Sequence, residues 1–223
     1  MSRASQFGRI LRAAATAGPY PAALAAYARG RRNAYQKVVE FAQLIALVKR
    51  HRPAVVVEIG TARGGTLWTW CKVAADDALI VSIDLPGGPF GGGYSEEFAP
   101  AMRRYAERGQ RVELIRADSH ETATLEEVTR ILDGRLTDLL FIDGDHHYEG
   151  VRRDFEMYAP LAQEFVVFHD ILPHDDPDCH VDRFWNEVKM RYRNEEIIDL
   201  QHVDPTFGRY GGLGVLYLSR TGS

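Results

Sequence analysis

The chain has 223 residues, of which 45% are hydrophobic, and a formal net charge of −4 at pH 7. This length and composition fit one α/β domain with an extension better than two domains. The sequence has no apolar run of the roughly 18 residues that a membrane span needs, and its two cysteines, Cys71 and Cys179, lack CxxC spacing. We therefore expect no membrane span and no disulfide scaffold, and reduced thiols indicate a cytoplasmic protein.

The first 35 residues differ from the rest in charge, because they hold six arginines and no acid while the remainder is net acidic. We predict a basic helical arm over 1–35, which packs on the neighbouring subunit of a homodimer or covers the substrate entrance, and one domain over 36–223. The arm matches no nucleic-acid-binding module, so we expect no nucleic-acid partner. Arg12, Pro19 and Pro21 interrupt its alanine-rich stretch, which argues against a secretory signal.

After the arm, the apolar residues alternate between helical and strand periodicity. In chain order, we predict helix 38–50, strand 54–60, helix 64–74, strand 78–84, helix 96–108, strand 111–118, helix 124–132, strand 137–144, helix 149–161, strand 164–171, helix 181–192, and strands 196–203 and 212–219. Thr124 and Glu127 have the spacing of a capping box at a helix start. We expect the last two strands to pair antiparallel. The alternation predicts an α/β fold with a doubly wound sheet.

Polar residues gather where these strands end, most clearly in VVVEIGTARGGT at 55–66 and LLFIDGDHHYEG at 139–150. The strand-end residues are Glu58, Gly60, Asp84, Asp118, Ser119, Asp143, Asp145, His169 and Asp170. Any single aspartate of this set is as easily a cap of the following turn or helix. Together they predict a ligand site at the carboxyl edge of the sheet, where doubly wound folds bind their ligands.

The glycine-rich turn after the first strand, GTARGG, departs from the GxGxxG spacing of dinucleotide sites. A ligand with an amino-acid end and a ribose, but without phosphate, suits this edge better. Backbone amides near Gly60 can meet a carboxylate, and Asp84 can accept bonds from both ribose hydroxyls. S-adenosylmethionine is such a ligand.

Five segments, VVEIGTARGGT, VSIDLP, IRADS, FIDGDHHYEGVRRDF and VVFHDI, resemble the class I S-adenosylmethionine-dependent methyltransferases. More narrowly, they resemble the metal-dependent O-methyltransferases grouped with the cephalosporin-hydroxylase type and with enzymes that methylate macrolide and polysaccharide sugars. The resemblance covers roughly residues 36 to 220 and implies a Rossmann-like sheet of seven strands, the last antiparallel. It also implies that Glu58, Gly60 and Thr66 surround the methionine end of the cofactor, that Asp84 binds the ribose, and that Asp118 and Ser119 bind the adenine.

The resemblance implies a metal site as well. Asp143 and the pair His169–Asp170 end two neighbouring strands, and their side chains can converge on one divalent cation, magnesium or alternatively manganese. The family usually has acidic or amide-type ligands where this chain has His169 and Asp170. His169 therefore either binds the metal, which would favour manganese, iron or zinc, or turns away from it. The resemblance places the catalytic base three residues after the first ligand, at His146, whose imidazole can take a hydroxyl proton near neutral pH.

We thus expect an O-methyltransferase that acts on a hydroxyl of a sugar, in a small molecule or an oligosaccharide. A catechol-like phenol is the alternative acceptor. The segment HDDPDCH at 174–180 is rich in ligand-type residues and leaves a metal-dependent hydrolase or phosphoesterase as a second class, although a solvated loop is the simpler interpretation. A ligand-binding relative without catalysis is the third alternative.

Overall fold

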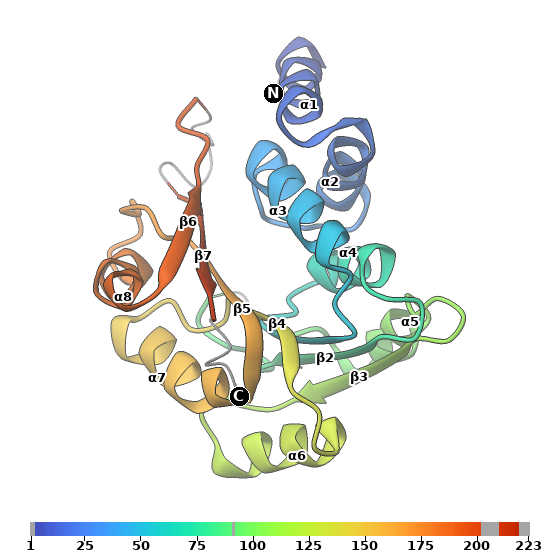
Figure 1. Cartoon of the computed structure of the whole chain (residues 1–223), viewed down its shortest axis with the longest axis vertical. Coiled ribbons are helices and arrows are strands. Elements are labelled where there is room, and N and C mark those ends of the chain that lie inside the picture. The colour runs from blue at the N-terminus through green and yellow to red at the C-terminus, as the bar shows by residue number, and fades with distance from the viewer. Residues whose placement is uncertain (1–2, 91, 202–209, 219–223) are drawn as a thin grey trace.

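A computed structural model describes residues 3–90, 92–201 and 210–218 of the chain. In that part, seven strands form one sheet in the order β3-β2-β1-β4-β5-β7-β6 (Figure 1). The strands are β1 Val55–Ile59, β2 Leu79–Asp84, β3 Arg111–Arg116, β4 Thr137–Ile142, β5 Ala162–His169, β6 Arg193–Ile197 and β7 Leu213–Tyr217. The first five strands pair in parallel, and β7 lies antiparallel between β5 and β6. The predicted doubly wound sheet with an antiparallel last strand is confirmed.

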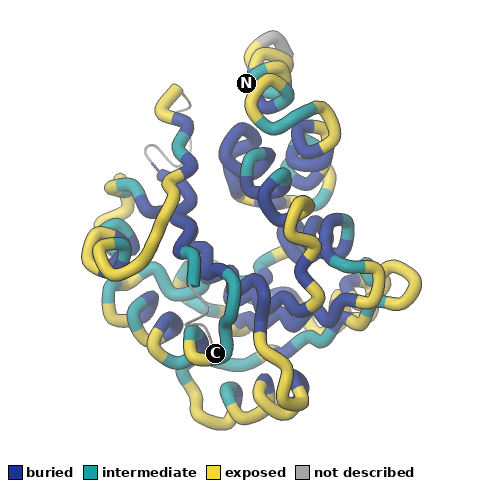
Figure 2. Tube along the Cα trace, viewed as in Figure 1, coloured by how far each residue is buried: buried dark blue, intermediate teal, exposed yellow. Residues whose placement is uncertain are grey.

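Helices cover both faces of this sheet (Figure 1). The α-helices are α1 Arg3–Ala17, α2 Pro19–Arg31, α3 Val38–His51, α4 Gly65–Val73, α5 Ala99–Arg103, α6 Thr122–Leu132, α7 Tyr148–Tyr158 and α8 Val181–Val188, and the short 3-10 turns are η1 Glu96–Phe98, η2 Ala159–Leu161 and η3 Lys189–Arg191. One apolar core joins the sheet to α1–α4, and a second core joins its other face to α6, α7 and α8. Buried residues run along β1, β2 and β4, while β6 and the outer side of α6 are largely exposed (Figure 2). No helix in the described part is long and apolar enough to cross a bilayer.

The N-terminal segment is helical and packs on its own chain. Helices α1 and α2 contact each other and both contact α3. Arg12 of α1 forms an ion pair with Asp199, at 3.0 Å, and Arg32 lies over the rings of Tyr27, Trp68 and Tyr105. The N-terminal helices therefore extend the layer of α3 and α4 and reach the C-terminal part of the chain.

Three predicted elements, α5, α6 and β6, have other boundaries in the structure. Helix α6 begins at Thr122, and its N-cap, Glu121, makes no side-chain bond, so Thr124 lies buried inside the helix and not at a capping box. The turn starts earlier because Oδ1 of Asp118 accepts a bond from the backbone N–H of His120 (2.8 Å).

The sixth strand starts earlier than predicted, at Arg193, and ends at Ile197. The chain leaves the sheet there because the backbone N–H of Asp199 donates to Oε1 of the buried Glu40 (2.8 Å). The predicted strand residues 202 and 203 lie outside the described residues. Helix α5 also ends earlier than predicted, at Arg103, and its first turn is the 3-10 turn η1.

Candidate active site

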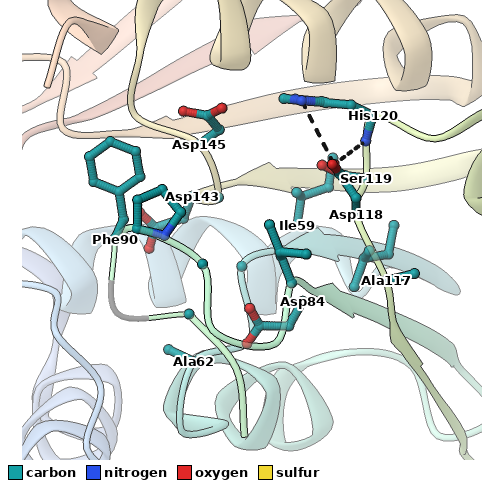
Figure 3. A pocket seen from close by; sticks show the side chains of 17 residues that line it. Ile59, Ala62, Asp84, Phe90, Ala117, Asp118, Ser119, His120, Asp143 and Asp145 are labelled. Atoms are coloured by element: carbon teal, nitrogen blue, oxygen red, sulfur yellow. Dashed lines mark hydrogen bonds and ion pairs between the residues drawn. The ribbon is translucent and has the colours of Figure 1, made fainter. Parts of the chain in front are cut away.

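Two adjoining cavities open at the carboxyl edge of the sheet. The first, here called the acidic cavity, is lined by residues that follow β1–β4, among them Gly60, Asp84, Asp118, Ser119, His120 and Asp145 (Figure 3). The second, here called the histidine cavity, is lined among others by Gln36, Thr66, His146, His169, Asp170 and Tyr210. Both cavities share Gly60, Ala62, Pro89, Phe90 and Asp143. A ligand in one cavity therefore lies directly beside a ligand in the other.

Gly60 fixes the ridge between the cavities. Its φ is 99°, in the left-handed region, and a Cβ there would lie 2.1 Å from the carbonyl oxygen of Asp143. The backbone N–H of Asp143 in turn donates to the carbonyl of Ile59 (2.8 Å). The ends of β1 and β4 can approach this closely because position 60 has no side chain.

Asp84 contributes a buried carboxylate to the wall of the acidic cavity. Its Oδ1 accepts a bond from the backbone N–H of Gly93 (3.1 Å), whereas Oδ2 has no hydrogen-bond partner in the described part of the chain. Burial raises the pKa of this carboxyl group, against the lowering effect of the backbone N–H groups around it. A ligand hydroxyl can satisfy the buried oxygen, as the predicted ribose contact requires.

Asp118 and Ser119 also reach the acidic cavity, where Asp118 lies beside His120 (Figure 3). The hydroxyl of Ser119 donates to Oδ1 of Asp154 (2.6 Å), and its carbonyl accepts a bond from the hydroxyl of Tyr158 (2.9 Å). Asp154 is fully buried, and burial raises the pKa of its carboxyl group. Sequence reasoning assigned no role to Asp154, although the FIDGDHHYEGVRRDF segment contains it.

Glu58, in contrast, lies below the cavities and lines neither of them. Its carboxylate accepts bonds from Nε1 of Trp70 (2.8 Å) and from Oγ of Ser82 (2.5 Å). Burial raises the pKa of Glu58 to about 7, and these donors, together with Thr66, offset part of the increase. Glu58 therefore joins β1, β2 and α4 under the site, while Thr66 and Gly60 face the cavities.

Four side chains from the ends of β4 and β5 meet in the histidine cavity. Nδ1 of His169 lies 3.1 Å from Oδ1 of Asp143 and 3.0 Å from Oδ2 of Asp170. Nε2 of His146 lies 3.4 Å from the same oxygen of Asp143, and its Nδ1 lies 3.7 Å from Oδ2 of Asp170. The structure thus brings together the predicted base and all three predicted metal ligands.

Neighbouring groups hold the two carboxylates in place. Nε2 of Gln36 donates to Oδ2 of Asp143 (2.8 Å), and the backbone N–H of Gly211 donates to Oδ1 of Asp170 (2.6 Å). Asp170 has a left-handed φ of 59°, a strained conformation for an aspartate that such contacts sustain. Sequence reasoning missed Gln36, because no motif marks a residue that reaches the site from another segment.

The charges of this cluster are strongly coupled. Burial raises the pKa of Asp143 and of Asp170, but the positive charge of His169 beside them outweighs this effect, so both pKa values fall below the ordinary aspartate value. Burial lowers the pKa of His146, but bonds to Asp143 and Cys179 and the charge of Asp170 outweigh it and raise that pKa to about 10. Two buried carboxylates therefore stay anionic and require positive charge beside them.

The donor set also fits a divalent cation. Ligand atoms of Asp143, His169 and Asp170 lie within 4.8 Å of one another, and so do those of His146, Asp170 and Cys179. Neither ring nitrogen of the buried His169 has a hydrogen-bond partner among the described residues. Carboxylate oxygens and an imidazole nitrogen are ordinary ligands of divalent metals.

Phe90 lines the acidic cavity (Figure 3) and also contacts the predicted base. Its ring stacks on His146 with a centroid distance of 4.7 Å and an interplanar angle of 21°. His147 instead bonds to Oδ1 of Asp145 through Nδ1 (2.7 Å) and is half exposed. The stacking partner was not predicted, since the glycine-rich segment around residue 90 has no periodic pattern.

The ligand-rich segment 174–180 folds largely on itself. The backbone N–H of Asp176 donates to Nδ1 of His174 (2.8 Å), and that of Asp178 donates to Oδ1 of Asp176 (3.0 Å). His174 and Asp176 line the histidine cavity, and the backbone N–H of His180 donates to the carbonyl of His146 (2.8 Å). The segment therefore shapes one wall of that cavity.

Comparison with known proteins identifies relatives of the chain. The family model described as "Methyltransferase domain" matches residues 57–171. An uncharacterised protein of Acanthamoeba polyphaga mimivirus is 29% identical over 147 residues, which cover 65% of this chain and 60% of that protein. The chain spans 14% and 60% of the lengths of the curated relatives it matches.

Two solved structures share the fold. The O-methyltransferase from Bacillus cereus, solved in complex with SAH, is 18% identical with a TM-score of 0.60, covering 98% of this chain and 93% of that one. A calicheamicin methyltransferase is 15% identical with a TM-score of 0.56, covering 88% of this chain and 90% of that one.

Proposed function

Because this chain belongs to the methyltransferase domain family, we propose that it transfers the methyl group of S-adenosylmethionine to a hydroxyl oxygen with the help of a divalent cation. The observation that carries the proposal is the pair of adjoining cavities. One offers a buried carboxylate oxygen of Asp84 to a ribose, and the other holds the cluster of Asp143, His146, His169 and Asp170. The fold neighbour from Bacillus cereus, which was solved with SAH, agrees with this choice of methyl donor.

The residues of the acidic cavity would hold the methyl donor. Asp84 would accept bonds from ribose hydroxyls, and Asp118 and Ser119, which the resemblance assigns to the adenine, line the same cavity. Gly60 and Thr66 border the passage to the histidine cavity, where the methionine end would lie. Orientation of donor and acceptor in adjoining cavities is the main contribution of such a site to rate.

The residues of the histidine cavity would act on the acceptor. When bound, the donor would supply a methyl group on positively charged sulfur. Asp143, His169 and Asp170 would hold a cation, which would lower the proton affinity of the acceptor hydroxyl. An imidazole nitrogen of His146 accepts the hydroxyl proton as the oxygen–carbon bond forms and the carbon–sulfur bond breaks. A cation beside His146 also favours its neutral form, which a base requires. Phe90, stacked on His146, holds the ring and restricts water.

We propose a sugar hydroxyl as the acceptor. The histidine cavity combines polar groups, Asn33, Gln36 and Asp176, with the aromatic rings of Tyr35 and Tyr210, a mixture that suits a carbohydrate. A small-molecule glycoside agrees with the calicheamicin methyltransferase among the fold neighbours. A catechol-like phenol is the second candidate, because the same aromatic rings can stack on it.

We also propose that the chain forms a homodimer through α1. Phe7 and Leu11 lie one turn apart on that helix and are 62% and 54% exposed. Sedimentation of the wild type and of the double variant Phe7→Glu/Leu11→Glu tests this contact. A monomeric wild type would contradict it.

Thermal unfolding of the pure protein tests the donor and the cation. S-adenosylhomocysteine at a hundredfold excess over its dissociation constant should stabilise the fold by about 2.7 kcal/mol, in EDTA as well as with added magnesium or manganese. Methyl transfer to a panel of glycosides and catechols, followed by mass spectrometry, then identifies the acceptor. Stabilisation by metal alone, without any effect of the nucleoside, would contradict the proposal and favour a hydrolase.

A further inference from the structure

The cation site proposed above has an unusual ligand at its centre. His169 ends β5 and is 4% exposed, and its Nδ1 lies between one oxygen of Asp143 and one oxygen of Asp170. We infer that this site selects a divalent transition-metal ion of the manganese, iron and cobalt class over magnesium, with Nδ1 of His169 as a ligand. The inference rests on the cation site of the proposed function and specifies its chemistry.

The spacing of the three ligand atoms supports a small cation. Nδ1 of His169 is 3.1 Å from Oδ1 of Asp143 and 3.0 Å from Oδ2 of Asp170. Two ligands at right angles, each about 2.1 Å from a metal, are about 3.0 Å apart, whereas calcium with bonds of about 2.4 Å would separate them by about 3.4 Å. The observed spacing therefore matches neighbouring ligands of an octahedral ion with short bonds.

The state of the imidazole supports a metal more than a salt bridge. Although two carboxylate oxygens lie within 3.1 Å of Nδ1, neither contact has hydrogen-bond geometry, and no described residue bonds to either ring nitrogen. A buried polar group without a partner destabilises the folded state. A metal ion bound by Nδ1 and by one oxygen of each carboxylate would give all three buried atoms a partner.

Asp143 and Asp170 each have one carboxylate oxygen available to bind a metal ion. Gln36 occupies Oδ2 of Asp143, and the backbone of Gly211 occupies Oδ1 of Asp170, so the remaining oxygens face His169. Such outer contacts orient metal ligands and are typical of built sites. Two single carboxylate oxygens and one imidazole leave positions open for the acceptor hydroxyl.

The identity of the donors then sets the selectivity. Magnesium takes oxygen ligands and retains its water, whereas an imidazole nitrogen favours manganese, iron, cobalt or zinc. The alternative group of His146, Asp170 and Cys179 would add a thiol and favour zinc. His146 lies 3.4 and 3.7 Å from the carboxylates, farther than His169, so the geometry favours the group that contains His169.

Metal binding to the full chain, after removal of metal with EDTA and desalting, tests the inference. Isothermal titration should show that manganese or cobalt binds at least about 100-fold more tightly than magnesium. In His169→Glu this ratio should fall at least about tenfold, because the variant replaces the nitrogen with oxygen. His174→Gln, which changes another histidine of the same cavity, should keep the wild-type ratio.

The spectrum of the cobalt-loaded protein gives a second measurement. The paramagnetically shifted N–H proton of a bound imidazole should appear in the wild type and in His174→Gln and be absent in His169→Glu. A thiolate-to-cobalt absorption band that disappears in Cys179→Ser would place the metal beside Cys179 and overturn the inference. Stabilisation of each variant by S-adenosylhomocysteine in EDTA shows that it is folded.

The outcomes separate this inference from the proposed function. Equal affinity for magnesium and manganese, or a ratio unchanged in His169→Glu, overturns the inference and leaves methyl transfer intact. Absence of any cation binding overturns both the inference and the metal-dependent part of the function. Selective manganese binding without stabilisation by the nucleoside supports the inference while it contradicts the choice of methyl donor.

Discussion

Acids of the β1–β2 half and of the β4–β5 half of the sheet are buried to a similar extent, but their pKa values shift in opposite directions. On the β1–β2 half, Asp84 is 6% exposed and Glu58, which lies below the cavities, is 0% exposed. Burial raises both pKa values. Asp170, after β5, is 4% exposed, yet its pKa is lowered because His169 and His146 lie beside it. Burial alone therefore does not decide the charge of an acid, since the neighbouring groups do. The first half suits a ligand with hydroxyl groups, and the second suits a cation and a proton transfer.

The largest effect should come from the base in the charged half. We expect His146→Ala to lower kcat by about 10²–10⁴, while affinity for S-adenosylhomocysteine stays unchanged, because proton removal is lost and the acidic cavity is intact. Single-turnover methyl transfer and calorimetry measure the two quantities. His147→Ala, at the half-exposed neighbour that pairs with Asp145, is the matched control. Unchanged turnover in His146→Ala would remove this residue from the mechanism.

The second prediction concerns the support of the charged half. Gln36→Leu removes the donor to Oδ2 of Asp143, and we expect affinity for the preferred cation to fall by about 10–100-fold. Gln43→Leu is the control, because Gln43 bonds to the carbonyl of Val39 within α3. Equal cation affinity in the two variants would show that Gln36 does not orient Asp143.

The third prediction uses the raised pKa of Glu58. The folded protein holds this proton more tightly than the unfolded chain, so the stabilisation is complete below about pH 4.3 and is lost as pH rises through about 7. The variant Glu58→Gln has no titrating carboxyl group at this position, so its stability does not fall in this way as pH rises. The free energy of unfolding of the variant, relative to the wild type, should therefore increase by about 2 kcal/mol between pH 5 and pH 8. A constant difference across this range, measured by urea unfolding, would show that Glu58 stays ionised.

The smallest effect should be seen at Asp84. Its carboxylate accepts hydroxyl groups best when ionised, so affinity for S-adenosylhomocysteine should weaken as pH falls through the raised pKa of Asp84. Asp84→Asn should bind S-adenosylhomocysteine about tenfold more weakly near neutral pH. Its affinity should not fall further at acidic pH. Titration calorimetry at several pH values measures both. Wild-type affinity in the variant would exclude Asp84 from ribose binding.

Much of the fold could be predicted because its signals are local. Apolar β-branched runs marked five parallel strands, and the acids after them marked the edge where the ligands bind. The meeting of Asp143, His146, His169 and Asp170 also followed, since β4 and β5 are neighbours in the sheet. Element ends were less predictable, as the early starts of α6 and β6 show, because contacts of Asp118 and Glu40 set them.

The supporting contacts of the site could not be read from the sequence. Gln36 and Phe90 reach it from segments that no periodicity links to the strand ends, and no motif marked Asp154 as a partner of Ser119. Glu58 shows the converse, since its motif predicted a cofactor contact but the side chain bonds to Trp70 and Ser82 below the cavities. Tertiary packing decides which polar side chain faces the ligand, and that information is not local.

The contacts of the charged cluster also have a consequence for folding. Asp143 is held by a residue 107 positions earlier in the chain, and Asp170 by a backbone group 41 positions later. Contacts of such long sequence separation form late and slow the folding of a domain. During synthesis, the ligands cannot be fixed until Gly211 has left the ribosome. Tight metal binding would then report that a newly made chain has finished folding.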